Sequence, residues 1–501
     1  MINARLAPLA GLAAAAFFIT TPACQADEAS AAARFSAAKR SEPELVAFLK
    51  GMPKGADLHN HAWGAIYAEN MLDFAVRNSF YMDPSSLAFS TQPAAGLVPA
   101  KDLLSNRPLA AKFLDAVSMR GGYPGLQSGH DHFFSAFRYF VALLDAMGPD
   151  QRLAEVIGRA KDQNVQYLEL MEEVSSDSAT ESALNDPPVI DDMEKALAAM
   201  RKRFPALLAD SKAYLDARDR EVSKLLGINA PVTSIASPIP IRYIFTVPRT
   251  WPDSRFFAGV AAGMALMQND GRVAAVNMLA PEDDPISRRN FESQMRMVDF
   301  LWSRLGRPNL TLHAGELTLE LSPLSAMRSR IRKTVELGHA RRIGHGVSIA
   351  WEDDLPGLLR EMRQKRVAVE ICLTSNEGIL KVSGDRHPFN LYRAAGIPLT
   401  INTDDEGVNR SNLTMEFVKA ARSFDLSYRD LKDLARNSLE YSFLPGESLY
   451  QAGDYARLRP EFSGVRALNW RPDARAQALL ASSEKLTIQV RLERAFSDFE
   501  K

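Results

Sequence analysis

Short aliphatic runs alternate with longer amphipathic stretches along most of this 501-residue chain. The alternation is typical of repeated βα units, whose strands form a parallel sheet. Eight such runs predict strands, and eight successive units favour an α/β fold in which the sheet closes into a (β/α)8 TIM barrel. The expected strands are Ala56–His61, Val165–Met171, Ile241–Val247, Val273–Leu279, Leu310–Glu316, Arg342–Gly346, Val367–Thr374 and Pro398–Asp404.

The first 26 residues have the order of a secretory signal peptide, because Arg5 precedes an apolar run that ends in small residues. We expect cleavage near Ala26 and a periplasmic or secreted protein. Anchoring as a lipoprotein through Cys24 is the less favoured alternative, because Thr21 stands where an aliphatic residue is usual. Removal of the signal peptide leaves only Cys372, so the mature chain cannot form an internal disulfide.

The domain organisation follows from the same pattern. The middle of the long polar stretch between the second and third strands has helical periodicity, which predicts an inserted helical pair over the barrel rim. A second long connection, 64–131, separates the first strand from its helix. The expected parts are a signal peptide (1–26), an N-terminal helical segment (27–50), the barrel (51–445, with the insertion at about 172–240) and a C-terminal helical extension (446–501).

The charge balance narrows the choice of partners. The chain has 60 Lys and Arg against 61 Asp and Glu, a net charge of -1, so no global field attracts nucleic acid or an anionic membrane. No segment after the signal peptide has the ~20 apolar residues of a transmembrane helix. We therefore expect a small-molecule partner, and the sequence leaves the oligomeric state open between a monomer and a homodimer.

Histidines and carboxylates gather at the ends of four expected strands, where catalytic groups of barrels collect. His59 and His61 are two residues apart on the first strand, so both imidazoles face the same side, a geometry suited to zinc. Adjacent strand residues face opposite sides, so Asp404 and Asp405 should have different roles. The other motifs are His313-Ala314-Gly315-Glu316, Gly344-His345-Gly346 and Thr403-Asp404-Asp405.

Each motif alone could be a buried histidine, a glycine turn or a helix cap, but their joint occurrence favours a catalytic site. In this order, H-x-H, HAGE, GHG and TDD resemble the adenosine deaminase branch of the metal-dependent amidohydrolases. The segment Met52-Pro53-Lys54-Gly55 is similar to the secreted, growth-factor-type adenosine deaminases. The resemblance runs from about Phe48 to Leu444 and includes the helix His132–Phe140, the turn Ser375–Gly378 and the segment Asn437–Ser442.

The resemblance implies zinc-dependent hydrolytic deamination of adenosine or a related 6-aminopurine nucleoside. It assigns one zinc per protomer to His59, His61, His313 and Asp404, and the metal would lower the pKa of a water toward ~7.

The resemblance also assigns the remaining roles. His345 and Asp404 would orient the water and accept its proton, and Glu316 would protonate ring N1. For that step Glu316 must itself be protonated, which requires a raised pKa in a dry pocket. Asp405 would hold N7.

Two departures from the family pattern put the substrate in doubt. Trp63 precedes Gly64 where the family commonly has Asp near the sugar, and Pro281 stands where a backbone N–H usually faces the purine. Phe133 and Phe137, one helical turn apart, are expected either to wall the purine site or to belong to the core.

Three functions are compatible with the sequence. Beside an adenosine deaminase, the chain could deaminate a different aminopurine, or be a catalytically silent zinc-containing binding or signalling protein. Glu316 and His345 argue against the silent protein, since neither is needed merely to hold a metal. The H-x-E and P-C-x-x-C signature of deaminases that act on flipped bases is absent from the sequence, which excludes the cytidine deaminase fold.

Overall fold

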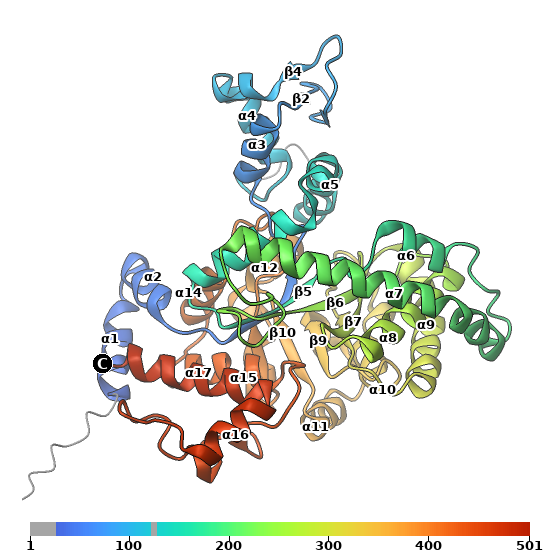
Figure 1. The fold of residues 1–501 in the computed structure, drawn as a ribbon. Helices are drawn as coiled ribbons and strands as arrows, with labels where there is room; N and C mark the ends of the chain where they lie inside the picture. Colours follow the sequence, from blue (N-terminus) through green and yellow to red (C-terminus); the bar gives the residue numbers. More distant parts are fainter. Residues whose placement is uncertain (1–26, 122–127) are drawn as a thin grey trace, which may run out of the picture.

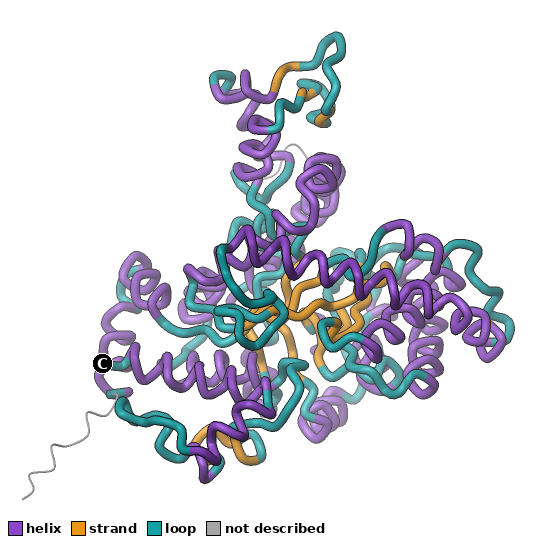
Figure 2. Tube along the Cα trace, viewed as in Figure 1, coloured by secondary structure: helices purple, strands orange, loops and turns teal. Residues whose placement is uncertain are grey.

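The computed structural model describes residues 27–121 and 128–501. Eight parallel strands lie at its centre and helices surround them (Figures 1 and 2). The central strands are β1 (Ala56–His61), β5 (Tyr167–Met171), β6 (Ile241–Pro248), β7 (Val273–Leu279), β8 (Thr311–Ala314), β9 (Arg342–His345), β10 (Ala368–Ile371) and β11 (Leu399–Ile401). Each overlaps one of the eight expected strands, so the predicted parallel α/β fold is confirmed.

The strands pair in chain order. One sheet has the order β1-β5-β6-β7 and the other β8-β9-β10-β11. A parallel bridge between Val276 and Leu310 joins β7 to the start of β8, and one between Asn60 and Asp404 joins β1 to the segment after β11. These pairings connect the eight strands in a ring, and their carboxyl ends meet on one side.

The central strands are buried along their length, as expected for parallel strands covered by helices. Each strand is followed by at least one helix of the outer layer. These helices are α5 (Gly129–Asp162), α7 (Met193–Leu226), α8 (Asp253–Asn269), α9 (Pro285–Arg304), α10 (Arg330–Glu336), α11 (Leu355–Lys365), α13 (Phe389–Ala394), α14 (Leu413–Ser423) and α15 (Tyr428–Glu440).

The polar stretch 172–240 contains two helices, α6 (Asp177–Leu184) and α7. α7 packs between α5 and α8, so it is the crossover helix of the unit from β5 to β6 and part of the outer layer. Only the beginning of the stretch, including α6, lines the cavity at the strand ends. The expectation of a helical pair over the rim is therefore corrected to one short helix.

The connection after β1 forms an arm that projects from the body of the molecule (Figure 1). Its three short strands form an antiparallel sheet of order β3-β2-β4. Phe89 lies between Phe80 and Phe113, with ring centroids 6.4 and 5.1 Å away, and the three rings form a small core. The arm comprises α3 (Ala68–Arg77), β2 (Tyr81–Met82), β3 (Phe89–Ser90), β4 (Val98–Pro99), a 3-10 helix (Ala100–Leu104) and α4 (Arg107–Ala116).

The two ends of the described chain pack together against α15. Lys432 of α15 pairs with Glu28 at 3.0 Å and with Glu500 at 2.5 Å. α15 ends at Glu440, and the expected C-terminal helical extension (446–501) contains a β-hairpin before its helices. The terminal elements are α1 (Glu28–Ala38), α2 (Glu42–Gly51), β12 (Tyr450–Gln451), β13 (Asp454–Leu458), α16 (Ala474–Ser482) and α17 (Glu484–Phe499).

The predicted signal peptide, with Arg5 and Cys24, lies outside the described residues. Among the helices of residues 27–121 and 128–501, none is long and apolar enough to cross a membrane. Cys372 is buried with a free thiol.

Candidate active site

A cavity of about 560 Å³ opens at the carboxyl ends of the strands. Its lining contains most of the residues that the sequence singled out, although they are far apart in the chain. These are His61, Trp63, Phe133, Phe137, His313, Glu316, His345, Asp404 and Asp405. His59 and Gly64 do not line the cavity, but both contact residues that do.

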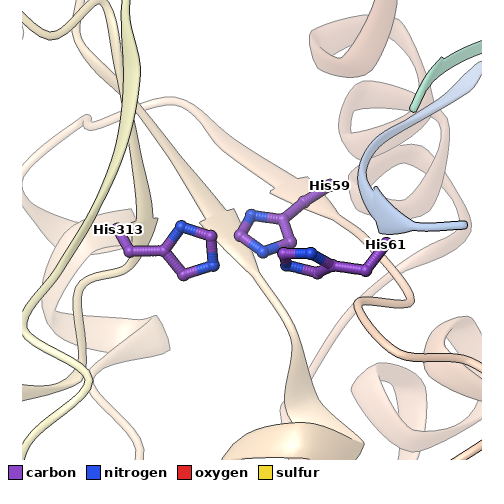
Figure 3. Close-up of side chains that lie close together, drawn as sticks. All are labelled: His59, His61 and His313. Carbon is purple, nitrogen blue, oxygen red and sulfur yellow. The ribbon is translucent and has the colours of Figure 1, made fainter. Parts of the chain in front are cut away.

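Three histidines converge on one point of this cavity. His59 and His61 extend from β1 and His313 from β8, with one nitrogen of each ring within 4.8 Å of the others (Figure 3). Asp404 Oδ1 lies 3.8 Å from His59 Nε2 and 3.5 Å from His61 Nε2. His59 Nε2 is buried and has no hydrogen-bond partner among the described residues. A buried lone pair aimed at two imidazoles and a carboxylate fits a divalent metal, and this donor set is one that zinc prefers.

Two residues behind the histidines determine which ring nitrogen is free. His59 Nδ1 donates to Glu370 Oε2 at 2.7 Å, and His313 Nδ1 donates to Asn277 Oδ1 at 2.8 Å. Both rings therefore present the Nε2 lone pair to the metal site. Burial alone would raise the pKa of Glu370, but Arg342 and His59 outweigh it and lower the pKa to about 2.

Glu370 and Asn277 were not among the residues predicted from the sequence. Each is the one strongly polar residue of an apolar, buried strand, β10 or β7. A fully buried polar side chain needs a partner, so this placement is a readable signal of a functional contact.

Glu316 lies two residues beyond the end of β8, after Gly315 at φ 79°. The Glu282 carboxylate fixes this turn by accepting the N–H of Gly315 at 3.1 Å and of Glu316 at 2.7 Å. Arg249 and Arg330 lie 3.4 and 3.2 Å from Glu282. Burial, followed by the charges of neighbouring carboxylates, raises the pKa of Glu316 well above its usual range, which favours the protonated carboxyl.

The prediction that Asp404 and Asp405 face opposite sides is wrong. β11 ends at Ile401, and Asp404 adopts a left-handed φ of 61°, so strand alternation no longer applies. Both carboxylates line the cavity. Burial and the charge of Asp404 raise the pKa of Asp405 well above its usual range, whereas the nearby histidines outweigh burial and lower that of Asp404.

Gly64 makes room for Asp405. A Cβ at Gly64 would lie 1.6 Å from Asp405 Oδ1. That oxygen is buried and has no hydrogen-bond partner among the described residues. Gly64 therefore has a steric role, and Asp405 presents an unused polar atom at the cavity.

His345 is held from behind by α12 (Leu373–Leu380). Residues Ser375–Gly378 were expected to form a turn, but they lie inside this helix. Asn376 Nδ2 lies 3.0 Å from His345 Nδ1, and His345 Nε2 lies 3.9 Å from Asp404 Oδ2. Burial lowers the pKa of His345 to about 3, so the ring is neutral.

Aromatic and acidic side chains form a further part of the cavity lining, here called the outer wall. Phe133 and Phe137 line it with ring centroids 5.6 Å apart, and both also contact the hydrophobic core. Trp63 lines it too, and the Arg152 guanidinium stacks 4.4 Å from its ring. Pro281, which has no N–H to offer a ligand, also lines the cavity, and Ala280 before it has a left-handed φ of 84°.

The charged side chains of this outer wall are carboxylates. They belong to Glu172, Glu173 and Asp177, and no Lys or Arg occurs among the described lining residues. The nearest guanidinium, Arg152, is buried and donates to Glu172 at 3.0 Å and to the Leu144 carbonyl at 2.7 Å. Its charge is therefore neutralised inside the protein.

Comparisons with known proteins agree with this geometry. The family model for adenosine deaminase matches residues 109–451. The chain is 38% identical over 137 residues to the adenosine deaminase of Enterococcus faecalis, covering 27% of this chain and 37% of that protein. It is 39% identical over 139 residues to the aminodeoxyfutalosine deaminase of Streptomyces coelicolor, covering 27% and 33%. The alignments thus span about a third of the length of these relatives.

Solved structures share the fold. The N6-mAMP deaminase of Arabidopsis matches with a TM-score of 0.50 and 18% identity over 80% of this chain and 96% of that one. An amidohydrolase from Burkholderia ambifaria, solved with bound zinc, matches with a TM-score of 0.50 and 18% identity over 80% and 88%. Because the family model covers more than half of its length, the chain belongs to the adenosine deaminase family.

Proposed function

We propose that this chain is an exported, zinc-dependent aminohydrolase with a (β/α)8 barrel, which converts adenosine or a related 6-aminopurine nucleoside to the 6-oxo product and ammonia. The observation that carries the proposal is that the buried Glu316 carboxyl, whose pKa is raised, lies in the cavity at which His61, His313 and Asp404 converge with His59. A hydrolytic deaminase needs both parts, an acid for the ring nitrogen and a site that activates water.

One zinc per protomer would be held by the three histidines and Asp404. When bound, it would supply a water whose pKa is lowered toward ~7. Asp404, with its low pKa, accepts a proton from the attacking water and later passes it to the leaving amine. His345 orients the water from the side of Asp404.

Glu316 transfers its proton to N1 as the water oxygen bonds to C6, which removes negative charge from the ring. The C6–N bond then breaks, ammonia leaves with the proton from Asp404, and the remaining hydroxyl proton returns to Glu316. Protonated Asp405 donates to N7, a ring nitrogen that can only accept.

The outer wall favours a nucleoside over a nucleotide. C6 and N9 lie on opposite sides of a purine, so the sugar points away from the histidine cluster, toward the outer wall. Glu172 is compensated by Arg152, but a phosphate ~4 Å from Asp177 or from an ionised Glu173 would be repelled by ~4 kcal/mol per unit charge at an effective dielectric constant of ~20. Adenosine is therefore a better candidate than AMP.

Export to the periplasm or medium is supported by the sequence of residues 1–26.

Kinship with the growth-factor-type enzymes rests on Met52-Pro53-Lys54-Gly55, whose lysine joins two segments of the fold. Lys54 Nζ donates to the carbonyls of Leu49, Met52 and Gln163 at 2.5, 2.9 and 2.8 Å. It thereby ties the end of α2 to the segment before β5.

The test is an ammonia-release screen of the purified mature chain. The panel contains adenosine, deoxyadenosine, adenine, substituted adenosines and guanine compounds, and metal content is measured in the same samples. We expect about one zinc per protomer, turnover of adenosine or a substituted adenosine, and loss of turnover after chelation. Undiminished activity in a chelated, zinc-free protein, or no ammonia from any aminopurine with zinc bound, would refute the proposal.

A further inference from the structure

His387 is a buried histidine that no step of the proposed mechanism uses. It follows α12 in the chain and is connected to His345 through the side chain of Asn376. The direction of each hydrogen bond in this chain follows from what the groups can donate and accept.

The first bond starts from a backbone amide. The N–H of Phe389 lies 3.1 Å from His387 Nδ1, and because an amide N–H can only donate, Nδ1 accepts. Burial lowers the pKa of His387 to about 4, so its single proton is on Nε2. Nε2 therefore donates to Asn376 Oδ1 at 3.1 Å.

The second bond passes this orientation to the active site. With its oxygen engaged by His387, Asn376 presents its NH2 group to His345 Nδ1 at 3.0 Å. An amide NH2 can only donate, so His345 Nδ1 accepts and carries no proton, which leaves the proton of the ring on Nε2. That nitrogen faces Asp404.

In two of the candidate metal ligands the ring proton is on the other nitrogen, Nδ1. Oxygen atoms of Glu370 and Asn277 accept from Nδ1 of His59 and His313, which leaves the Nε2 lone pairs free for metal. His345 has an N–H where those rings have a lone pair.

We infer that Asn376 and His387 are positioning residues that hold the proton of His345 on Nε2. His345 is thereby kept out of the metal ligand set and acts as a hydrogen-bond donor beside Asp404. The catalytic consequence rests on the proposed function, whereas the position of the proton does not.

The alternative arrangement shows why His387 is needed. Rotation of the Asn376 amide by half a turn would aim Oδ1 at His345 and require the proton on Nδ1. Nε2 of His345 would then present a lone pair, as the ligand histidines do. In that arrangement the Asn376 NH2 would face the N–H of His387, and two buried donors without acceptors cost more than a hydrogen bond gains.

Three variants separate positioning from packing. Asn376→Asp keeps the shape but offers His345 only an acceptor, so we expect kcat to fall by about hundredfold or more, with KM and zinc content little changed. His387→Phe removes the donor that orients Asn376, so kcat should fall about fivefold, as for the loss of one hydrogen bond. His387→Gln restores an N–H donor and should recover most of that loss.

The matched control is His339→Phe. His339 is paired with Asp299 and stacked on Trp302 outside the cavity. We expect it to leave kcat unchanged. Wild-type kcat in Asn376→Asp would overturn the inference, as would equal losses in the His387→Phe and His387→Gln variants.

The proton itself can be located without activity. In metal-free protein with 15N-labelled histidine, the His345 signals, assigned through His345→Asn, should show a protonated Nε2 and an unprotonated Nδ1. In Asn376→Asp the pattern should reverse. A protonated Nδ1 in the wild type would overturn the inference whether or not the protein is active. The expected pattern in a protein that deaminates nothing would refute the proposed function alone.

Discussion

Replacement of Gly64 by alanine tests whether Asp405 must occupy its observed place. The new Cβ would lie 1.6 Å from Asp405 Oδ1 and 2.4 Å from its Cγ, whereas ordinary contacts begin at 3.4 Å. Asp405 Oδ1 must therefore move by about 1.8 Å. A misplacement of ~1 Å can cost ~10²-fold in rate, so we expect kcat/KM for adenosine to fall about hundredfold, or ~2.7 kcal/mol. Overpacking of this buried site should also destabilise the protein by ~1 to 3 kcal/mol.

Steady-state kinetics, zinc analysis and thermal unfolding test these values. Zinc content should stay near that of the wild type, because the three heavy atoms nearest to the new methyl group all belong to Asp405, which is not one of the proposed ligands. Gly271→Ala is the matched control, since a Cβ there meets nothing within 4 Å. The double variant Gly64→Ala with Asp405→Ser should recover stability but not activity. Wild-type kcat/KM in Gly64→Ala would show that the position of Asp405 does not matter for catalysis.

Four further predictions follow from the site. Glu316→Gln removes the proton for N1, so kcat should fall by ~10² to 10⁴ with zinc retained, and unchanged turnover would refute the acid role. Glu370→Gln weakens the orientation of His59, so zinc affinity in competition with a chelator should fall by about 10- to 100-fold; unchanged affinity would refute this role. The kcat/KM for AMP should lie about hundredfold below that for adenosine at low salt, and added NaCl should narrow the gap by screening the carboxylates of the outer wall; a gap independent of salt would argue against charge repulsion. Because Trp63 cannot accept a hydrogen bond as a carboxylate does, kcat/KM for 5′-deoxyadenosine should lie within about tenfold of that for adenosine, or ~1.4 kcal/mol; a hundredfold preference for adenosine would contradict this reading.

The parts of the site that lie on regular strands could be predicted from the sequence. His59 and His61 are on β1 and His313 is on β8, so period-two alternation and the strand order were sufficient to bring them together. The aliphatic runs predicted the strands themselves because parallel strands are buried on both faces.

The parts at and beyond the strand ends could not be predicted in this way. Asp404 and His345 have φ values of 61° and 68°, which residues with a side chain rarely adopt. The periodicity of a sequence does not predict a residue with a positive φ, and each such residue changes the direction of the chain after it. The same limit explains why Ser375–Gly378 were expected to form a turn, although they belong to α12.

Trp63 stands in the cavity wall where the family commonly has a carboxylate, while the proposed metal ligands and Glu316 keep the family pattern. The indole is one layer of a stack in which the Arg152 guanidinium lies 4.4 Å from its ring and donates to Glu172 behind it. Arg152 is buried and fully engaged, so it offers no charge to a ligand, and Trp63 is the member of this pair that lines the cavity. An aromatic face recognises area and shape, whereas a carboxylate recognises a hydroxyl. In the proposed enzyme the sugar side would therefore discriminate by contact, whereas His313 and Glu316 belong to β8 and the turn after it, away in the chain from Trp63 at the end of β1.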